Sequence, residues 1–132
     1  GEDANIQAAR SRGEEYLLAR HLFKRLRTGG TISRDNWYKP LGNNPAFTAL
    51  GFPNWWHHDI LRGLDYFRRA DKFDPRLEEA LQLLQDKQQA DGRWLMEADY
   101  NGNALASLDA KEGEPSKWIT FRAALVLQWQ QA

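Results

Sequence analysis

The stretch that decides the fold is FPNWWHHDILRGLDYF, residues 52–67. Its apolar residues recur at the spacing of one helix face, at Trp56, Ile60, Leu64 and Phe67. Just before this run stands Asn54, whose side chain can accept a hydrogen bond from a free amide in the first turn of a helix. We therefore predict a helix from about Trp55 to Ala70 that is capped by Asn54.

Three further helices are predicted around it. Good helix formers fill residues 5–27, and Gly29 and Gly30 stand where that helix would end. Asp74 as a cap, followed by proline, begins a helix over 75–89. Ser116 caps a fourth helix that ends near Gln131. Its apolar side is predicted to be largely buried and holds Trp118, Phe121, Leu125 and Trp129. Ile119, Ala123 and Val126 widen this side.

These helices predict an all-α fold and one domain, residues 1–132. The N-terminal helix occupies 1–28, a long aromatic-rich loop occupies 29–53, and a region of helical hairpins occupies 54–132. Because few residues join the second helix to the third, we expect these two to form an antiparallel hairpin.

The amino-acid composition argues against several functional classes. The 132 residues hold eighteen basic and eighteen acidic side chains, so no overall field favours nucleic acid or an anionic membrane. No apolar run reaches the roughly 20 residues of a membrane span. The chain has no cysteine, which excludes disulfides and thiolate chemistry. We expect a soluble protein, with the cytoplasm as its location.

One segment carries a family resemblance. Residues 88–94, QQADGRW, resemble the QW motif of squalene cyclases, and residues 52–67 and 115–127 resemble helical hairpins of the wider squalene-cyclase and prenyltransferase-like family. The resemblance implies an arc of an α/α toroid, or else a helical bundle. It also implies structural roles for a small set of residues, namely Gln88, Gly92, Trp94, Ser116 and Trp118.

The catalytic residues of that family do not carry over. The acid cluster of the cyclases, Asp-x-Asp-Asp, is missing, and so is the cysteine with which protein prenyltransferases hold zinc. The chain is also far too short for a complete ring. We therefore expect no cofactor and no enzyme activity from this chain alone, and a longer chain or a second copy as its complement.

Aromatic and titratable residues near the second helix form a candidate pocket. Its members are Trp55, Trp56, His57, His58, Asp59, Arg62 and Trp94. Such a pocket would take an apolar or sugar ligand. A metal is not expected, because adjacent histidines on a helix point in different directions and metal pairs usually stand three or four residues apart. The alternative reading makes the tryptophans packing anchors and the histidines hydrogen-bonded members of the helix interface.

Three functional hypotheses follow from the sequence. The first is a non-catalytic toroid-like domain for packing or partner binding, with exposed apolar surface and self-association. The second is a fragment or divergent member of a cyclase-like enzyme that acts on an apolar isoprenoid. The third is a binding module for a carbohydrate or another small ligand.

Overall fold

The computed structural model describes residues 3–32, 46–54, 57–98 and 109–132. The elements in these ranges are α1 (Ala4–Ala19), α2 (Ile60–Ala70), the 3-10 turn η2 (Pro75–Leu77), α3 (Glu78–Asp86), β1 (Trp94–Leu95), β2 (Pro115–Ser116) and α4 (Lys117–Gln131). The described part of the chain is therefore mostly helical, as predicted. The short antiparallel pair β1–β2 is an addition to the expected all-α fold. The arrangement as an arc of a toroid or a bundle stays a prediction.

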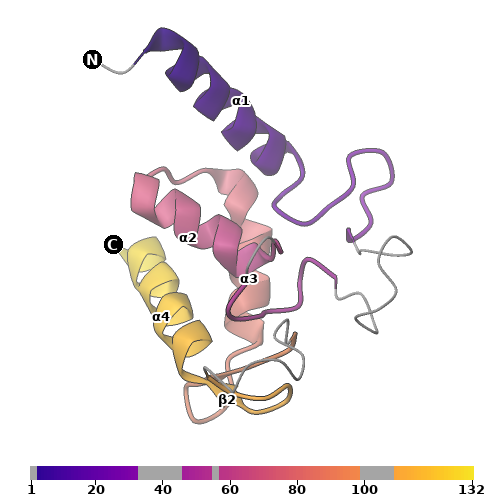
Figure 1. Ribbon diagram of the computed structural model, residues 1–132, viewed down its shortest axis with the longest axis vertical. Coiled ribbons are helices and arrows are strands. Elements are labelled where there is room, and N and C mark those ends of the chain that lie inside the picture. Colours follow the sequence, from indigo (N-terminus) through magenta and orange to yellow (C-terminus); the bar gives the residue numbers. More distant parts are fainter. Residues whose placement is uncertain (1–2, 33–45, 55–56, 99–108) are drawn as a thin grey trace.

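The core lies where α2, α3 and α4 meet (Figure 1). Each helix contributes apolar side chains that are almost completely shielded from water, among them Leu64 and Phe67 of α2, Leu81 and Leu84 of α3, and Ile119 and Val126 of α4. Burying one such side chain stabilises the folded state by about 1.5–3 kcal/mol. The three helices therefore depend on one another for stability.

Helix α1 lies apart from these three (Figure 1). Leu18 is its only buried residue. Two polar contacts also hold it: Glu14 accepts a hydrogen bond from Tyr66 at 2.7 Å and pairs with Lys72 at 3.0 Å. Helix α1 is thus attached mainly through its C-terminal half.

The prediction of a helix over 1–28 is wrong at its C-terminal end. Helix α1 stops at Ala19, and His21 and Leu22 have positive φ angles of 49° and 71°, which a helix does not accommodate. This change of direction turns Leu22 and Phe23 into the core, where both are buried. Burial of two large apolar side chains therefore outweighs the local preference for a longer helix.

The second helix begins later than predicted, and a different residue caps it. Helix α2 starts at Ile60, and Asp59 accepts a hydrogen bond from the Arg62 amide at 2.8 Å. Asn54 instead donates its side-chain amide to Asp59 at 2.7 Å. The predicted helical residues Trp55 and Trp56 lie outside the described residues.

The third helix begins where predicted. Asp74 accepts a hydrogen bond from the Arg76 amide at 2.8 Å, and Pro75 opens the 3-10 turn that leads into α3. Helix α3 ends at Asp86, before the predicted Gln89. The short connection places α2 and α3 next to each other, as expected from its length.

The fourth helix confirms its predicted cap and buries one part of its predicted apolar side. Ser116 accepts a hydrogen bond from the Ile119 amide at 3.1 Å. The buried residues of α4 are Ile119, Ala123 and Val126. In contrast, Trp118 and Phe121, which were expected to be buried, are 43% and 59% exposed. Small Ala123 lets α4 approach its neighbours closely, which leaves the bulkier aromatic side of the helix outside the core.

Candidate functional site

The predicted site residues at the start of α2 are bound into the structure around them. His57 is buried, and its Nδ1 lies 3.1 Å from the carbonyl oxygen of Asn54. His58 places Nε2 3.1 Å from the Leu22 carbonyl oxygen, and the edge of its ring meets Phe47 at 5.0 Å between centroids. Both histidines therefore join the loop before α2 to other parts of the fold.

Asp59 organises the same region from inside. Its buried carboxylate accepts hydrogen bonds from the Gly51 amide at 3.1 Å, from the Asn54 side chain at 2.7 Å and from the Arg62 amide at 2.8 Å. Burial raises the pKa of Asp59, although these donors act in the opposite direction. The carboxylate holds residues 51–54 against the first turn of α2.

Trp94 lies at the end of α3. Its indole is buried and donates a hydrogen bond to the Leu84 carbonyl oxygen at 2.8 Å, in the last turn of α3, where that oxygen also accepts the Lys87 amide at 3.3 Å. Nearby, the Gln88 side chain donates to the Gly92 carbonyl oxygen at 3.1 Å, and Gly92 has a φ of 87°. These contacts are structural ones, and they cover the end of a helix.

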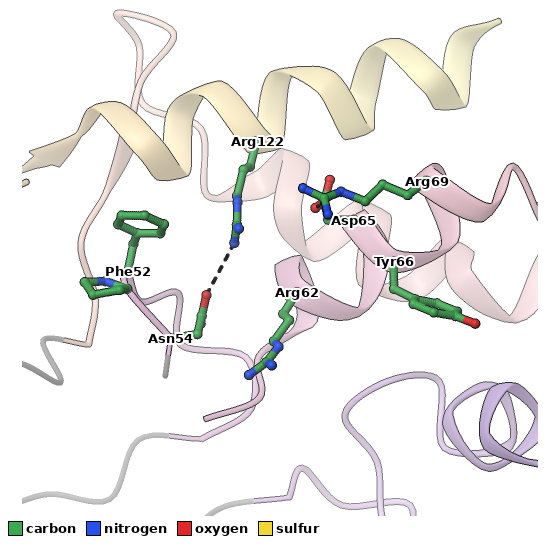
Figure 2. A pocket seen from close by; sticks show the side chains of 8 residues that line it. Phe52, Asn54, Arg62, Asp65, Tyr66, Arg69 and Arg122 are labelled. Atoms are coloured by element: carbon green, nitrogen blue, oxygen red, sulfur yellow. Dashed lines mark hydrogen bonds and ion pairs between the residues drawn. The ribbon is translucent and has the colours of Figure 1, made fainter. Parts of the chain in front are cut away.

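A pocket of about 410 Å³ opens between α2, α4 and the loop before α2. It is lined by Phe52, Pro53, Asn54, Arg62, Asp65, Tyr66, Arg69 and Arg122. In Figure 2, Arg122 extends from α4 toward Asn54, Arg62 lies on the other side of Asn54, and Arg69 lies beside Asp65. Of the predicted pocket residues that the structure describes, Arg62 is the one that lines this cavity, which we call the arginine pocket.

The arginine pocket has an excess of positive charge. Among the described residues that line it, Asp65 is the one acidic residue, and it is shared by two guanidinium groups, those of Arg68 at 2.8 Å and Arg69 at 3.2 Å. Arg62 donates to the His57 carbonyl oxygen at 2.8 Å, which fixes the direction of its side chain. Since guanidinium groups stay protonated at all ordinary pH values, this positive charge is permanent.

Beside the pocket, α4 carries an apolar strip that we call the aromatic strip, formed by Trp118, Phe121, Leu125 and Trp129. Trp118 and Phe121 are exposed, whereas Leu125 and Trp129 are half-buried and Trp129 packs against the core. Phe52, a wall of the pocket, stacks on Trp118 at 5.6 Å between centroids, so the pocket and the strip are continuous. At the other end of α4, the Trp129 indole donates to Asp71 at 3.0 Å, and its ring lies 6.0 Å from that of Phe73.

Sequence reasoning missed most of the pocket. Arg62 and Arg69 stand seven residues apart, so they share one face of α2, and this spacing was a usable signal. Arg122 and Phe52 carried no comparable signal. Their place in the pocket depends on how α4 packs against the loop before α2, which no local pattern reveals.

The described ranges contain neither a membrane-spanning helix nor a cluster of metal ligands. No helix there has the length and apolar character that crossing a bilayer requires. Nor do three or more His, Asp or Glu side chains gather there in a group that would hold a metal ion. Comparison with protein-family models, characterised proteins and solved structures produced no match.

Proposed function

We propose that this chain is a non-catalytic helical domain that associates with a second copy of itself through the aromatic strip. The observation that carries the proposal is the exposure of Trp118 and Phe121, at 43% and 59%, on a helix that buries Ile119, Ala123 and Val126 in the core. Monomeric proteins rarely leave a contiguous apolar surface of this kind uncovered.

The order of residues along the strip favours a second copy as the occupant. A two-fold contact brings the same surface of both copies together, so the strip must be complementary to itself. If two α4 helices crossed in antiparallel directions, Trp118 of each would approach Trp129 of the other, with Phe121 and Leu125 between them. The large rings at the two ends suit this arrangement.

Charge at the ends of α4 supports the same arrangement. Lys117 lies in the first turn, and Asp71 lies beside the last turn through its hydrogen bond with Trp129. In the antiparallel pair, Lys117 of each copy would face the second copy's Asp71. Opposite charges placed at the rim of an interface set the register and direction of association.

Light scattering and sedimentation over a range of concentrations test the proposal. We expect a reversible dimer of the 15.3 kDa chain. Phe121→Glu should raise the dissociation constant by about tenfold or more, because it buries a charge in the contact. Leu26→Glu is the matched control, since Leu26 is similarly exposed, at 61%, but lies in the turn after α1. A strict monomer at every concentration would overturn the proposal.

A charge exchange tests the direction of the contact. Lys117→Asp and Asp71→Lys should each weaken the dimer, and the two changes combined should restore it, because the pair is then reversed. Dimers that form equally well in all three variants would exclude the antiparallel arrangement. Circular dichroism of each variant checks that the fold is retained.

A further inference from the structure

We propose that the arginine pocket binds a small anion, a phosphate or a carboxylate, that is attached to an apolar group. This inference does not depend on self-association, because it concerns the cavity beside the strip and not the strip itself. Three features of the pocket support it: a guanidinium with no carboxylate partner among the described residues, a lining that is partly charged and partly apolar, and the volume of the cavity.

Arg122 is the cation that would receive the anion. Among the described residues, no carboxylate lies within ion-pair distance of it. Its contacts there are the ring of Phe52, 5.3 Å from the guanidinium carbon, and the side-chain oxygen of Asn54 at the long distance of 3.5 Å. A guanidinium has five N–H donors, so most of those of Arg122 remain for a ligand. Its flat fork matches the paired oxygens of a carboxylate or phosphate.

The surrounding charges favour an anion. Asp65 is the only acidic residue in the described part of the lining, and Arg68 and Arg69 already occupy its two oxygens. It therefore offers little repulsion to an incoming negative group. The Asn54 side chain donates a hydrogen bond to Asp59 at 2.7 Å. This bond fixes the position of Asn54, whose side-chain oxygen Arg122 contacts. A site that is ordered before the ligand arrives loses less entropy on binding.

The remaining lining explains why the anion should carry an apolar group. Phe52 and Pro53 supply apolar surface to the lining, whereas Tyr66, another lining residue, directs its ring away from them (Figure 2). Its volume of about 410 Å³ is within the range of small-molecule sites and exceeds what a bare phosphate would fill.

Calorimetric titration at low ionic strength tests the inference with four probes: phenyl phosphate, benzoate, inorganic phosphate and benzyl alcohol. We expect one or both of the aromatic anions to bind more tightly than inorganic phosphate and benzyl alcohol. Comparison of phenyl phosphate with benzoate then identifies the preferred anionic group. Equal binding of inorganic phosphate would overturn the apolar part of the inference, and no binding of either aromatic anion at millimolar concentrations would overturn all of it.

Variants assign the binding to Arg122. Arg122→Gln should weaken it by about tenfold, the expected cost of losing a charged hydrogen-bond donor. Arg122→Lys should weaken it less, because the charge is kept while the fork is lost. Arg25→Gln, in the turn after α1, is the matched control and should bind as the wild type does. Equal affinity in Arg122→Gln and wild type would overturn the assignment. Phe121→Glu should still bind, which separates this result from the test of self-association.

Discussion

Asp59 joins two parts of the chain with one carboxylate. It caps α2 through the Arg62 amide and fixes the preceding loop through Gly51 and Asn54. Both oxygens are used, and the group is buried. A residue in this position affects stability in two ways, since its loss removes the cap and leaves buried donors without an acceptor.

We therefore predict that Asp59→Ala lowers the free energy of unfolding by about 3 kcal/mol. Asp59→Asn should cost less, because asparagine caps helices about as well as aspartate does. Urea denaturation followed by tryptophan fluorescence measures both. Asp86→Ala is the control, since Asp86 is exposed at the end of α3 and bonds to Gln82 alone in the described structure. Equal losses in Asp59→Ala and Asp86→Ala would contradict this account.

Caps show how far the sequence predicts single residues. Asp74 and Ser116 were recognisable because each stands directly before an apolar helical pattern. For α2 the sequence predicted Asn54 as the cap, whereas the structure uses Asp59, and capping propensity alone does not separate asparagine from aspartate. Asp59 is the cap because its carboxylate also accepts a hydrogen bond from the Gly51 amide, which lies across the loop.

At the level of elements, α1 is attached by charged groups. Glu14 bonds to Tyr66 and Lys72, and Glu15 pairs with Arg76 at 2.8 Å. Burial acts to raise the pKa of Glu14, but the hydrogen bonds from Tyr66 and Lys72 outweigh it and the pKa is lowered from its ordinary value of 4.5. The attachment of α1 is therefore sensitive to acid.

The direction in which stability changes with pH follows from the shift of the Glu14 pKa between the unfolded and the folded chain. Because the pKa of Glu14 is lower in the folded chain, its contribution to stability is present above pH 4.5 and is lost as the pH falls through the folded value. We predict that Glu14→Gln is less stable than wild type at pH 7 by about 0.5 kcal/mol, the scale of a partly exposed ion pair. At pH 3 the difference should be smaller.

Urea midpoints of both proteins at the two pH values measure this effect. Glu112→Gln is the control, because Glu112 is exposed in the turn before β2 and should show no such difference at either pH. A Glu14→Gln deficit that is equally large at pH 3 would mean that the carboxylate charge is not responsible.

Element boundaries and faces were less predictable than element types. All four helices were expected from their composition, but the end of α1 depends on Leu22 and Phe23 being drawn into the core. The apolar side of α4 was predicted, but the part of it that is buried could not be, because apolar residues extend around much of this helix. Ile119 faces the core and Phe121 does not, and only the packing partners distinguish them.

Over the whole molecule, stability is concentrated in α2, α3 and α4. Helix α1 places one buried residue against them, Leu18, whereas α4 places three. The two terminal helices are similar in length, at 16 and 15 residues, so their different contributions come from burial and not from size.

Two deletions of equal length test this distribution. Removing residues 1–16 should leave one cooperative unfolding transition with a nearly unchanged dependence on urea, because little apolar surface is lost from the core. Removing residues 117–132 should abolish cooperative unfolding, since Ile119, Ala123 and Val126 go with them. Loss of the transition in the first deletion would show that α1 is an integral part of the core.

The arginine pocket also depends on the whole molecule, because residues from separate elements form it. Arg62 and Arg69 are placed by the period of α2, but Arg122 reaches the pocket only because α4 packs beside α2. The sequence therefore pointed to one of the three arginines of the site. It grouped Arg62 with Trp94, which instead covers the end of α3.

The way α1 is attached has a mechanical consequence. If the chain were pulled by its two ends, α1 and α4 would carry the same tension, but α1 holds one buried residue and α4 holds three, so α1 would detach first. This helix should peel away at low force, with Leu18 as the last point of resistance. The three remaining helices would then share the load and rupture in a single, later event.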